Sequence, residues 1–534
     1  MSNPIPASDL SQVKIFDTTL RDGMQGTGIS YTLKDKIEIA RRLDEMGFDY
    51  IEGGFPLANE KEEAFFAHMK KEKLSHARLA AFGSTRKPGR KAAEDPHILA
   101  LLQAETPGVV VVGKAWMAHV TDVLGTQAQE NLDMIYDSIS YLKSQGREVI
   151  FDLEHFFDGW KAHPDYSKAI LTLASDAGAD VLVPCDTNGG TLVTEVNSIY
   201  NQIKELNLKV SLGGHFHNDL GLGVANSLAA VEGGAVHIQG TINGWGERCG
   251  NANLCVIVPN LVLKMGRTIS LLPHLERLTE LSRFVAEKAN VLPDRRQPFV
   301  GEAAFSHKAG QHADVLQKAQ HLMEHMDPAL VGNSRKILLS ELAGKSTVVL
   351  KMSKYGHFDK NSSEVGRLTQ LLKEREGLGY EYEAAEASFE LLILKMLDRY
   401  QPLFELDNYH LESFKTWDGQ AKTVGRIFIQ SADKKYLGAA VGKGPVGVLD
   451  RALRDALDQT HPFIRNITLT DFSVRVLNAQ ESHAEGRVRV FVTLSCGTES
   501  WDTVGVSENI VEASWEALVD GFEYWYNTKV CAKK

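Results

Sequence analysis

Short β-rich runs and helical patterns alternate eight times between Val13 and about residue 250, and this alternation constrains the fold more than any other feature. Between the predicted strands lie amphipathic segments such as 34–47, with apolar residues at helical spacing and a glycine at the end. Eight strand and helix units over about 250 residues are typical of a (β/α)8 TIM barrel. The predicted strands are Val13–Asp17, Tyr50–Gly53, Arg78–Phe82, Val109–Val112, Val149–Glu154, Val181–Val183, Val210–His217 and Val236–Ile242.

A doubly wound open sheet is the alternative architecture for this alternation. That fold places Gly-x-Gly-x-x-Gly after its first strand, and no such motif follows Asp17. Polar clusters instead follow most of the predicted strands, where the active sites of TIM barrels lie. These clusters are Arg21-Asp22, Glu52, Glu154-His155, Asp186-Thr187-Asn188, His215 with His217, and 247–251.

The pattern changes twice beyond residue 261. An amphipathic helix is predicted over Leu271–Lys288, and the segment Pro293–Pro298 is predicted to be a linker. Strand patterns over Thr423–Gln430, Thr468–Leu477 and Arg487–Ser495, with a helix at Val446–Leu457, indicate a separate α+β module. We therefore expect a catalytic barrel in 1–285, helical linker subdomains in 286–404 and an α+β regulatory domain in 405–534.

Composition narrows the class of protein. The chain is 43% hydrophobic and 24% charged, has a net charge of −11, and holds five cysteines without a Cys-x-x-Cys spacing. These values predict a globular protein without a disulfide framework or thiolate zinc site. The acidic balance disfavours nucleic-acid binding, and the lack of a long apolar run or signal peptide predicts no membrane contact and a cytoplasmic location.

The spacing His215-x-His217 places two imidazoles on one face of a predicted strand, because side chains in a strand alternate. Two unrelated histidines are the alternative, but carboxylates at neighbouring strand ends favour a shared metal. Asp17 or Asp22 can supply the oxygen ligand, and Asn251 can add an amide oxygen. This set of nitrogen and oxygen donors suits a divalent Mg, Mn or Zn ion acting as a Lewis acid.

The roles of Arg21, Thr187 and the pair His312 and Asp314 each allow two interpretations. Arg21 can hold a carboxylate or stabilise a developing alkoxide, or form a structural ion pair. Thr187 can offer its hydroxyl to a small acid or cap the following helix. His312 and Asp314 can form a proton-transfer pair that closes over the barrel, or belong to an ordinary polar loop.

Four ordered motifs resemble the 2-isopropylmalate synthase, homocitrate synthase and citramalate synthase family of metal-dependent aldol-type TIM barrels. The motifs are Phe16-Asp-Thr-Thr-Leu-Arg-Asp-Gly23, His215-x-His217-Asn-Asp219, Gly246-Glu-Arg-Cys-Gly-Asn251 and His312-x-Asp314. The carboxyl-terminal module is similar to the allosteric domain of the leucine-inhibited and isoleucine-inhibited members. The resemblance therefore covers most of the chain and implies a homodimer.

The resemblance implies a role for each site residue. Asp22, His215, His217 and Asn251 match the metal ligands, which leaves Asp17 in a supporting position. Arg21 matches the residue that polarises the 2-oxo group and stabilises the new alkoxide. Glu154 and Thr187 match positions that contact the 2-oxo acid, and His312 with Asp314 matches the group that deprotonates acetyl-CoA.

Two departures from the common family pattern bear on the substrate. Met24 replaces the usual glutamate of Arg-Asp-Gly-Glu-Gln, and Gly53 replaces the valine of Ile-Glu-Val-Gly-Phe-Pro. Both resemble a branch of long citramalate synthases, which implies condensation of acetyl-CoA with pyruvate to citramalate in isoleucine biosynthesis, with isoleucine as effector. The alternatives are 2-oxoisovalerate as the acceptor in leucine biosynthesis, cleavage of a hydroxyacyl-CoA, and a metabolite sensor without catalysis.

Overall fold

The computed structural model describes residues 12–307, 323–337, 345–431, 433–477, 486–497 and 499–531. It divides into two compact units, Met1–Phe305 with Met326–Arg335, and Ser306–His325 with Lys336–Lys534. The predicted pair His312 and Asp314 lies outside the described residues. Each unit has its own hydrophobic core, so each is described by itself.

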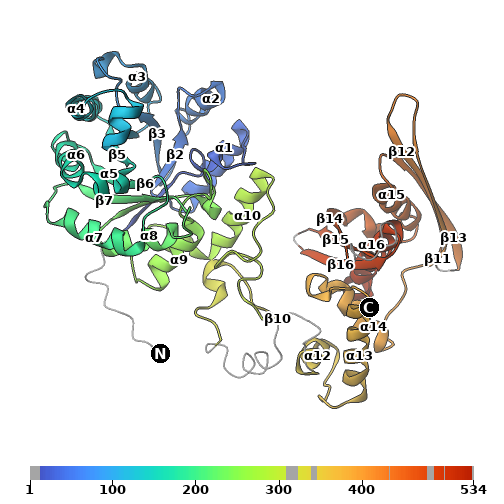
Figure 1. The fold of residues 1–534 in the computed structure, drawn as a ribbon. Helices are drawn as coiled ribbons and strands as arrows, with labels where there is room; N and C mark the ends of the chain where they lie inside the picture. Colours follow the sequence, from blue (N-terminus) through green and yellow to red (C-terminus); the bar gives the residue numbers. More distant parts are fainter. Residues whose placement is uncertain are drawn as a thin grey trace. The chain divides into compact units, whose positions relative to one another are not determined.

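Eight parallel strands close into a barrel in the first unit, which confirms the predicted fold class (Figure 1). The strands follow one another around the barrel in chain order, and β1 closes the ring by pairing with β8, with Asp17 opposite Gly240. The strands are β1 (Lys14–Asp17), β2 (Tyr50–Gly54), β3 (Arg78–Ser84), β4 (Gly108–Lys114), β5 (Glu148–Glu154), β6 (Val181–Asp186), β7 (Ser211–Phe216) and β8 (His237–Gly240).

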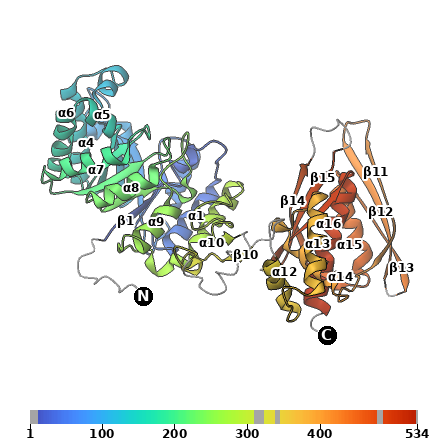
Figure 2. The same cartoon turned by 60° about the horizontal axis from the view of Figure 1, so that its bottom comes forward.

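Helices surround the barrel, as Figures 1 and 2 show. The predicted helix at 34–47 is α1, which begins with a capping box between Thr32 and Asp35. The predicted helix Leu271–Lys288 instead starts as a 3-10 helix at Leu272–Arg277 and becomes α-helical only in α10. The helices are α1 (Leu33–Glu45), α2 (Glu60–Met69), α3 (Pro96–Gln103), α4 (Ala128–Ser144), α5 (Phe156–Ala162), α6 (Pro164–Asp176), α7 (Val193–Lys204), α8 (Gly223–Glu232), α9 (Leu254–Leu263) and α10 (Leu278–Ala289).

Side chains of the barrel strands divide between two apolar layers. Those that point outward pack against the helices in one large core, and those that point inward fill the barrel itself. The inner layer includes Phe16, Tyr50, Val110, Ile150 and Val183, all with at most 1% of their surface exposed. Because this layer plugs the barrel, the polar residues at the carboxyl ends of the strands are displayed above a dry, rigid floor.

The second unit contains two successive units of three antiparallel strands and a helix (Figure 1). Other elements precede them: β9 (Ser306–His307), β10 (Lys336–Ile337), α12 (Lys345–Met352), α13 (Ser363–Gly377) and α14 (Glu386–Met396). The first unit of three strands is β11 (Glu405–Lys415), β12 (Ala421–Ser431), β13 (Lys434–Gly442) and α15 (Pro445–Asp458), and the second is β14 (Thr468–Val476), β15 (Val488–Cys496), β16 (Glu499–Ser507) and α16 (Ile510–Trp525).

The predicted helix at Val446–Leu457 is α15, and the three predicted strands are β12, β14 and β15. The strand count was too low, because β11, β13 and β16 also form. Most residues of β11 are exposed, and β13 is rich in glycine and alanine, so neither shows the alternation of buried apolar residues that predicts a strand.

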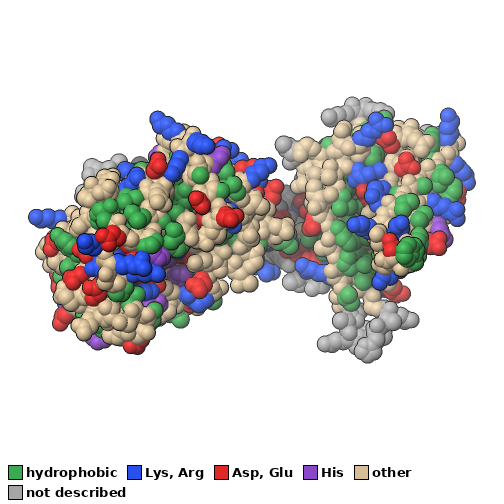
Figure 3. Space-filling view, turned by 90° about the horizontal axis from the view of Figure 1, so that it is seen from above, with side chains coloured by type: hydrophobic (Ala, Val, Ile, Leu, Met, Phe, Trp, Pro, Cys, Tyr) green, Lys and Arg blue, Asp and Glu red, His purple; other side chains and the backbone are tan. Residues whose placement is uncertain are grey.

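The surface carries charges of both signs. On the face drawn in Figure 3, lysine and arginine side chains are interspersed with aspartate and glutamate among the described residues. Among the helices of the described residues, none combines the length and the apolar character that a bilayer crossing needs.

Candidate metal and substrate site

The predicted metal ligands come from three different strand ends. Asp22 follows β1, His215 lies on β7, His217 follows that strand directly, and Asn251 lies in the loop after β8. Ligand atoms of Asp22, His215 and His217 all lie within 4.8 Å of one another, and all three side chains are buried. The barrel thus brings residues separated by almost 200 positions in the chain to one point at its carboxyl-terminal mouth.

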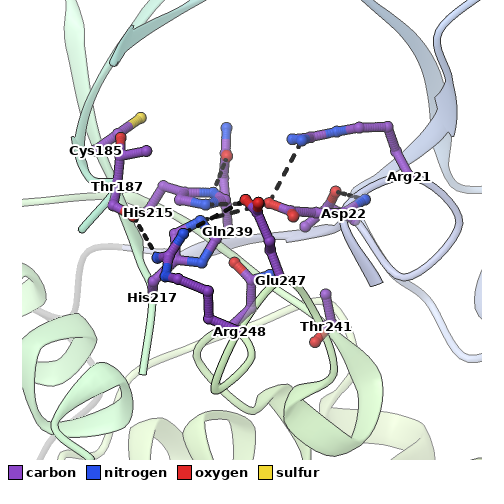
Figure 4. Close-up of polar contacts among 12 residues, drawn as sticks. Arg21, Asp22, Cys185, Thr187, His215, His217, Gln239, Thr241, Glu247 and Arg248 are labelled. Carbon is purple, nitrogen blue, oxygen red and sulfur yellow. Dashed lines mark hydrogen bonds and ion pairs between the residues drawn. The ribbon is translucent and has the colours of Figure 1, made fainter. Parts of the chain in front are cut away.

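A single carboxylate oxygen of Asp22 faces three cationic or potentially cationic groups. Its Oδ2 lies 3.4 Å from Nε2 of His215, 3.9 Å from Nε2 of His217 and 3.4 Å from Nη1 of Arg21 (Figure 4). Burial alone would raise the pKa of Asp22, but Arg21 and the two histidines outweigh it and hold that pKa well below its usual range. Asp22 is therefore ionised at neutral pH and available as a ligand.

A hydrogen-bond chain fixes the orientation of His215. Gln239 on β8 donates through Nε2 to Oδ1 of Asp152 at 3.0 Å, so its Oε1 accepts from Nδ1 of His215 at 2.8 Å. This arrangement places the Nδ1 proton of His215 on the side of Gln239 and leaves Nε2 to face Asp22. Burial opposes protonation of His215, but the contact with Asp22 dominates and raises its pKa, which marks the point between them as a place for positive charge.

His217 and Asn251 complete the cluster. Burial, reinforced by the neighbouring His215, lowers the pKa of His217 to about 4, so its imidazole is neutral at pH 7. An isolated antiparallel β-bridge between the backbones of His217 and Asn251 holds the two residues side by side. Oδ1 of Asn251 is buried with no hydrogen-bond partner among the described residues. A Cβ at Gly246 would lie 2.1 Å from Nδ2 of Asn251, so the loop needs glycine there.

These residues fit a divalent metal ion. They offer one carboxylate, two imidazoles and one amide oxygen, which are ligands for Mg, Mn or Zn. Oδ1 of Asp22 and Oδ1 of Asn251 are both buried without a hydrogen bond among the described residues. Buried acceptors without donors are costly unless a cation satisfies them, so the cluster has the chemistry of a metal site.

Arg21 lies beside this cluster and is held from two sides. Its Nε donates to Oε2 of Glu52 at 2.7 Å, and its guanidinium lies over the ring of Phe82 at 4.1 Å from the centroid. Thr18 donates to the same Glu52 oxygen at 2.5 Å and accepts from the backbone N–H of Asp22 at 3.2 Å. The structural ion pair that was one of the two alternatives for Arg21 thus exists, with Glu52 and not Asp17 as its partner, and it positions the guanidinium beside Asp22.

Asp17 lies apart from the ligand cluster. It accepts hydrogen bonds from the backbone N–H and the hydroxyl of Thr19, at 3.0 and 2.8 Å. Burial raises its pKa to about 7 despite those bonds. Thr19 in turn accepts from the backbone N–H of Ile242, so Asp17 fixes the first turn against the loop after β8.

The predicted substrate residues lie at the ends of β5 and β6. Glu154 forms an ion pair with Lys114 at the end of β4. Oγ1 of Thr187 accepts from the backbone N–H of His155 at 2.9 Å, and Leu192 is the N-cap of α7. The helix-cap alternative for Thr187 is therefore wrong.

Sequence reasoning missed Gln239, Asp152 and Phe82, which hold His215 and Arg21 in place. Gln239 shows a signal in retrospect, because it is a polar residue inside a fully buried strand, His237–Gly240. Asp152 similarly interrupts an apolar run in β5. A buried polar residue needs a partner, but the sequence does not say which one.

Comparison with known proteins agrees with this architecture. A family model described as HMGL-like matches residues 12–285, which cover the barrel. A model of the homocitrate synthase post-HMGL domain matches residues 299–377, and a model of the LeuA allosteric (dimerisation) domain matches residues 383–526. The matched models follow one another along the chain with short gaps.

Curated relatives match over nearly the whole length. An (R)-citramalate synthase of Aquifex aeolicus is 47% identical over 96% of this chain and 97% of its own, and one of Geobacter sulfurreducens is 45% identical over 96% and 98%. A 2-isopropylmalate synthase of Methanocaldococcus jannaschii is 30% identical over 98% of this chain and 95% of its own. The chain therefore belongs to the HMGL-like family and, within it, to the family of the (R)-citramalate synthases.

Proposed function

We propose that the protein condenses acetyl-CoA with pyruvate and hydrolyses the resulting thioester, releasing (R)-citramalate and CoA. The observation that carries this function is the identity of 43–47% to five (R)-citramalate synthases over at least 96% of the chain. The cluster of Asp22, His215 and His217 at the mouth of the barrel supports it independently. In this reaction the protein is an acyltransferase, in which the acetyl group of acetyl-CoA becomes an alkyl group on transfer.

The chain's own residues account for recognition of the 2-oxo acid. Asp22, His215, His217 and Asn251 would hold a divalent ion, which when bound supplies Lewis-acid polarisation of the 2-oxo acid. Arg21 is already held by Glu52 and Phe82, so its remaining N–H groups can bind the keto oxygen without reorganisation. As negative charge develops on that oxygen, the guanidinium stabilises it. Thr187 and Glu154 line the mouth on the side of β5 and β6.

Condensation and hydrolysis follow one another. His312, assisted by Asp314, removes a proton from the methyl group of acetyl-CoA, the carbanion equivalent forms the new carbon–carbon bond to C2 of pyruvate, and the alkoxide left on that carbon takes up a proton. Water then attacks the thioester carbonyl and loses its protons, the C–S bond breaks, one proton goes to the CoA thiolate, and the new carboxyl group is released ionised. The roles of His312 and Asp314 rest on the family motif alone, because both residues lie outside the described part of the chain.

The remaining expectations concern context. We infer Mg, Mn or Zn as the metal from the donor set, and a cytoplasmic enzyme of isoleucine biosynthesis from the reaction. The matched allosteric (dimerisation) domain supports a homodimer and a feedback ligand, for which isoleucine, the end product, is the candidate. The division at residues 285 and 404 into barrel, linker and regulatory domain stays a prediction.

A comparison of acceptors tests the function directly. We expect kcat/KM for pyruvate, measured by CoA release with acetyl-CoA, to exceed that for 2-oxoisovalerate. A higher value for 2-oxoisovalerate would favour a 2-isopropylmalate synthase instead. No CoA release with any 2-oxo acid, from metal-loaded folded protein, would favour a metabolite sensor that does not catalyse.

A further inference from the structure

The turn between β5 and α5 contains an unusual backbone conformation at His155. This residue has φ of 54° and ψ of 35°, which is the left-handed region that non-glycine residues rarely occupy. It is also 8% exposed, so the strained residue lies inside the protein and not at a loop tip. Strain of this kind persists only where the surroundings hold it, and it concentrates at functional sites.

The left-handed turn aims the backbone N–H of His155 at the side chain of Thr187. The donor nitrogen lies 2.9 Å from Oγ1. A threonine hydroxyl offers one proton and two acceptor lone pairs, and this contact occupies one of the lone pairs. The backbone carbonyl of Thr187 accepts from Nη2 of Arg248 at 2.6 Å, so the residue is held on both sides. A 2-oxo acid anion carries only acceptor oxygens, so the hydroxyl proton is the group that Thr187 can offer it.

The position of Thr187 places that proton next to the metal ligands. Strands β6 and β7 pair with Asp186 opposite Phe216, so the next residues along the two strands are Thr187 and His217. The backbone N–H of His217 donates to the carbonyl of Asp186 at 3.3 Å. Figure 4 shows Thr187 on the same side of the site as His215 and His217, facing Arg21 and Asp22. A 2-oxo acid bound there meets a hydroxyl donor opposite the Arg21 guanidinium.

Side-chain contacts hold His155 in its conformation. Its Nδ1 lies 3.6 Å from Oδ2 of Asp158, and its ring is 4.1 Å from that of His119, centroid to centroid. The same Asp158 oxygen accepts from Nδ2 of Asn188 at 3.0 Å, and Asn188 directly follows Thr187. The turn after β5 is therefore joined to the turn after β6 at two points.

We propose that His155 is a positioning residue: its left-handed backbone anchors the Thr187 oxygen through one lone pair, which orients the hydroxyl so that its proton can be donated to the 2-oxo acid. The ligand chemistry that this recognises is an acceptor oxygen, carboxylate or keto, of a small acid. The inference rests on the proposed function and adds to it the residue that orients the substrate contact.

A series of substitutions at position 155 separates the backbone from the imidazole. Every replacement except proline keeps the N–H, but they differ in how readily they adopt a left-handed conformation. Glycine and asparagine adopt it most easily, alanine adopts it at a cost in conformational free energy, and that cost is largest for valine. We expect KM for pyruvate to stay lowest in His155→Gly and His155→Asn and to rise about tenfold in His155→Val. KM for acetyl-CoA should stay within about twofold throughout the series.

Two variants of Thr187 complete the experiment. Thr187→Ser keeps the hydroxyl and should keep a low KM for pyruvate, whereas Thr187→Val should raise it. Combining His155→Val with Thr187→Val should raise KM no further than Thr187→Val alone, because both remove the same contact. Thermal unfolding of each variant checks that it is folded.

Two results would overturn the inference. Equal KM for pyruvate in His155→Gly, His155→Asn and His155→Val would mean that the backbone conformation does not matter. Additive effects in the double variant would mean that His155 acts elsewhere. Failure of the proposed function is distinguishable, because then the unsubstituted protein would not form citramalate at all.

Discussion

The side chains of the candidate site surround one oxygen atom, Oδ2 of Asp22. A guanidinium and two imidazoles lie within 4 Å of it, while Oδ1 of the same carboxylate has no hydrogen bond among the described residues. His215 is fixed from behind by Gln239, and Arg21 by Glu52. Each group is thus pre-oriented before any ligand arrives, which is what electrostatic catalysis requires.

Removal of an imidazole tests the metal site. We expect His217→Ala to lose divalent metal and turnover while the barrel stays folded, because His217 contributes a ligand and belongs to neither apolar layer of the barrel. The loss in metal affinity should exceed about 100-fold, the upper range for removing a residue that only supports a ligand. Metal content after dialysis and CoA release measure it. His163→Ala is the matched control, because His163 is exposed and its side chain makes no cap hydrogen bond to α6.

Removal of Gln239, which holds His215 in place, should lower metal affinity by less than removal of His217 does. Gln239→Leu removes the acceptor of the Nδ1 proton, so metal affinity should fall by about 10-fold to 100-fold without complete loss of turnover. Full metal affinity in both His217→Ala and Gln239→Leu would mean that the cluster does not bind the metal.

Among the elements, α16 carries a buried carboxyl group. Glu523 is 4% exposed and lines a cavity of about 500 Å³ together with Lys395, Tyr400 and Trp515. Burial raises its pKa to about 7. Because the folded protein then binds the proton more tightly than the unfolded chain, this group's stabilising contribution is complete below about pH 4.5 and is lost as the pH rises through 7.

Replacement of Glu523 should flatten that pH dependence. With a pKa raised from 4.5 to about 7, ionisation of the group costs about 3 kcal/mol of stability by pH 8. We expect Glu523→Gln to gain stability relative to the unsubstituted protein at pH 8 and not at pH 4.5, measured by urea unfolding. Glu512→Gln is the control, since Glu512 is exposed on the same helix. Parallel pH profiles for Glu523→Gln and the unsubstituted protein would contradict the prediction.

The proposed metal ligands and the matched allosteric domain belong to different compact units of the chain. The proposed metal ligands and Arg21 all lie within residues 21–251 of the barrel unit, which has its own core. The helical segment before residue 404 belongs with the carboxyl-terminal sheets instead. Phe389 of α14 shares a core with Val504 of β16, and the backbone N–H of Val504 donates to Ser388 at 3.0 Å.

The division of the chain into two units suggests where it can be truncated without breaking a hydrophobic core. We expect a chain that ends at Arg335 to keep the barrel fold and part of the condensation activity, and to lose inhibition by isoleucine. A chain that ends at Phe404 should be less soluble, because Phe389 and Leu392 of α14 lose their partners on β16. Inhibition curves and light scattering measure both effects. Inhibition retained in the shorter chain would place the effector site in the barrel.

Local patterns were sufficient for much of the barrel. Strand periodicity put His215 and His217 on one face, and the eight alternating units predicted the closed sheet that brings strand ends together. They were insufficient for β11 and β13, whose residues are mostly exposed or small, so hydrogen bonding to neighbouring strands decides their conformation.

Hydrophobic periodicity and ordered motifs are local properties of the chain, so they were enough to predict the barrel, the family and the residue types of the metal cluster. Which side chains contact one another depends on the closed barrel. Gln239 contacts His215, and the N–H of His155 contacts Thr187. Each of these contacts joins separate turns or strands. Closure of the sheet, and not spacing in the chain, sets their distances.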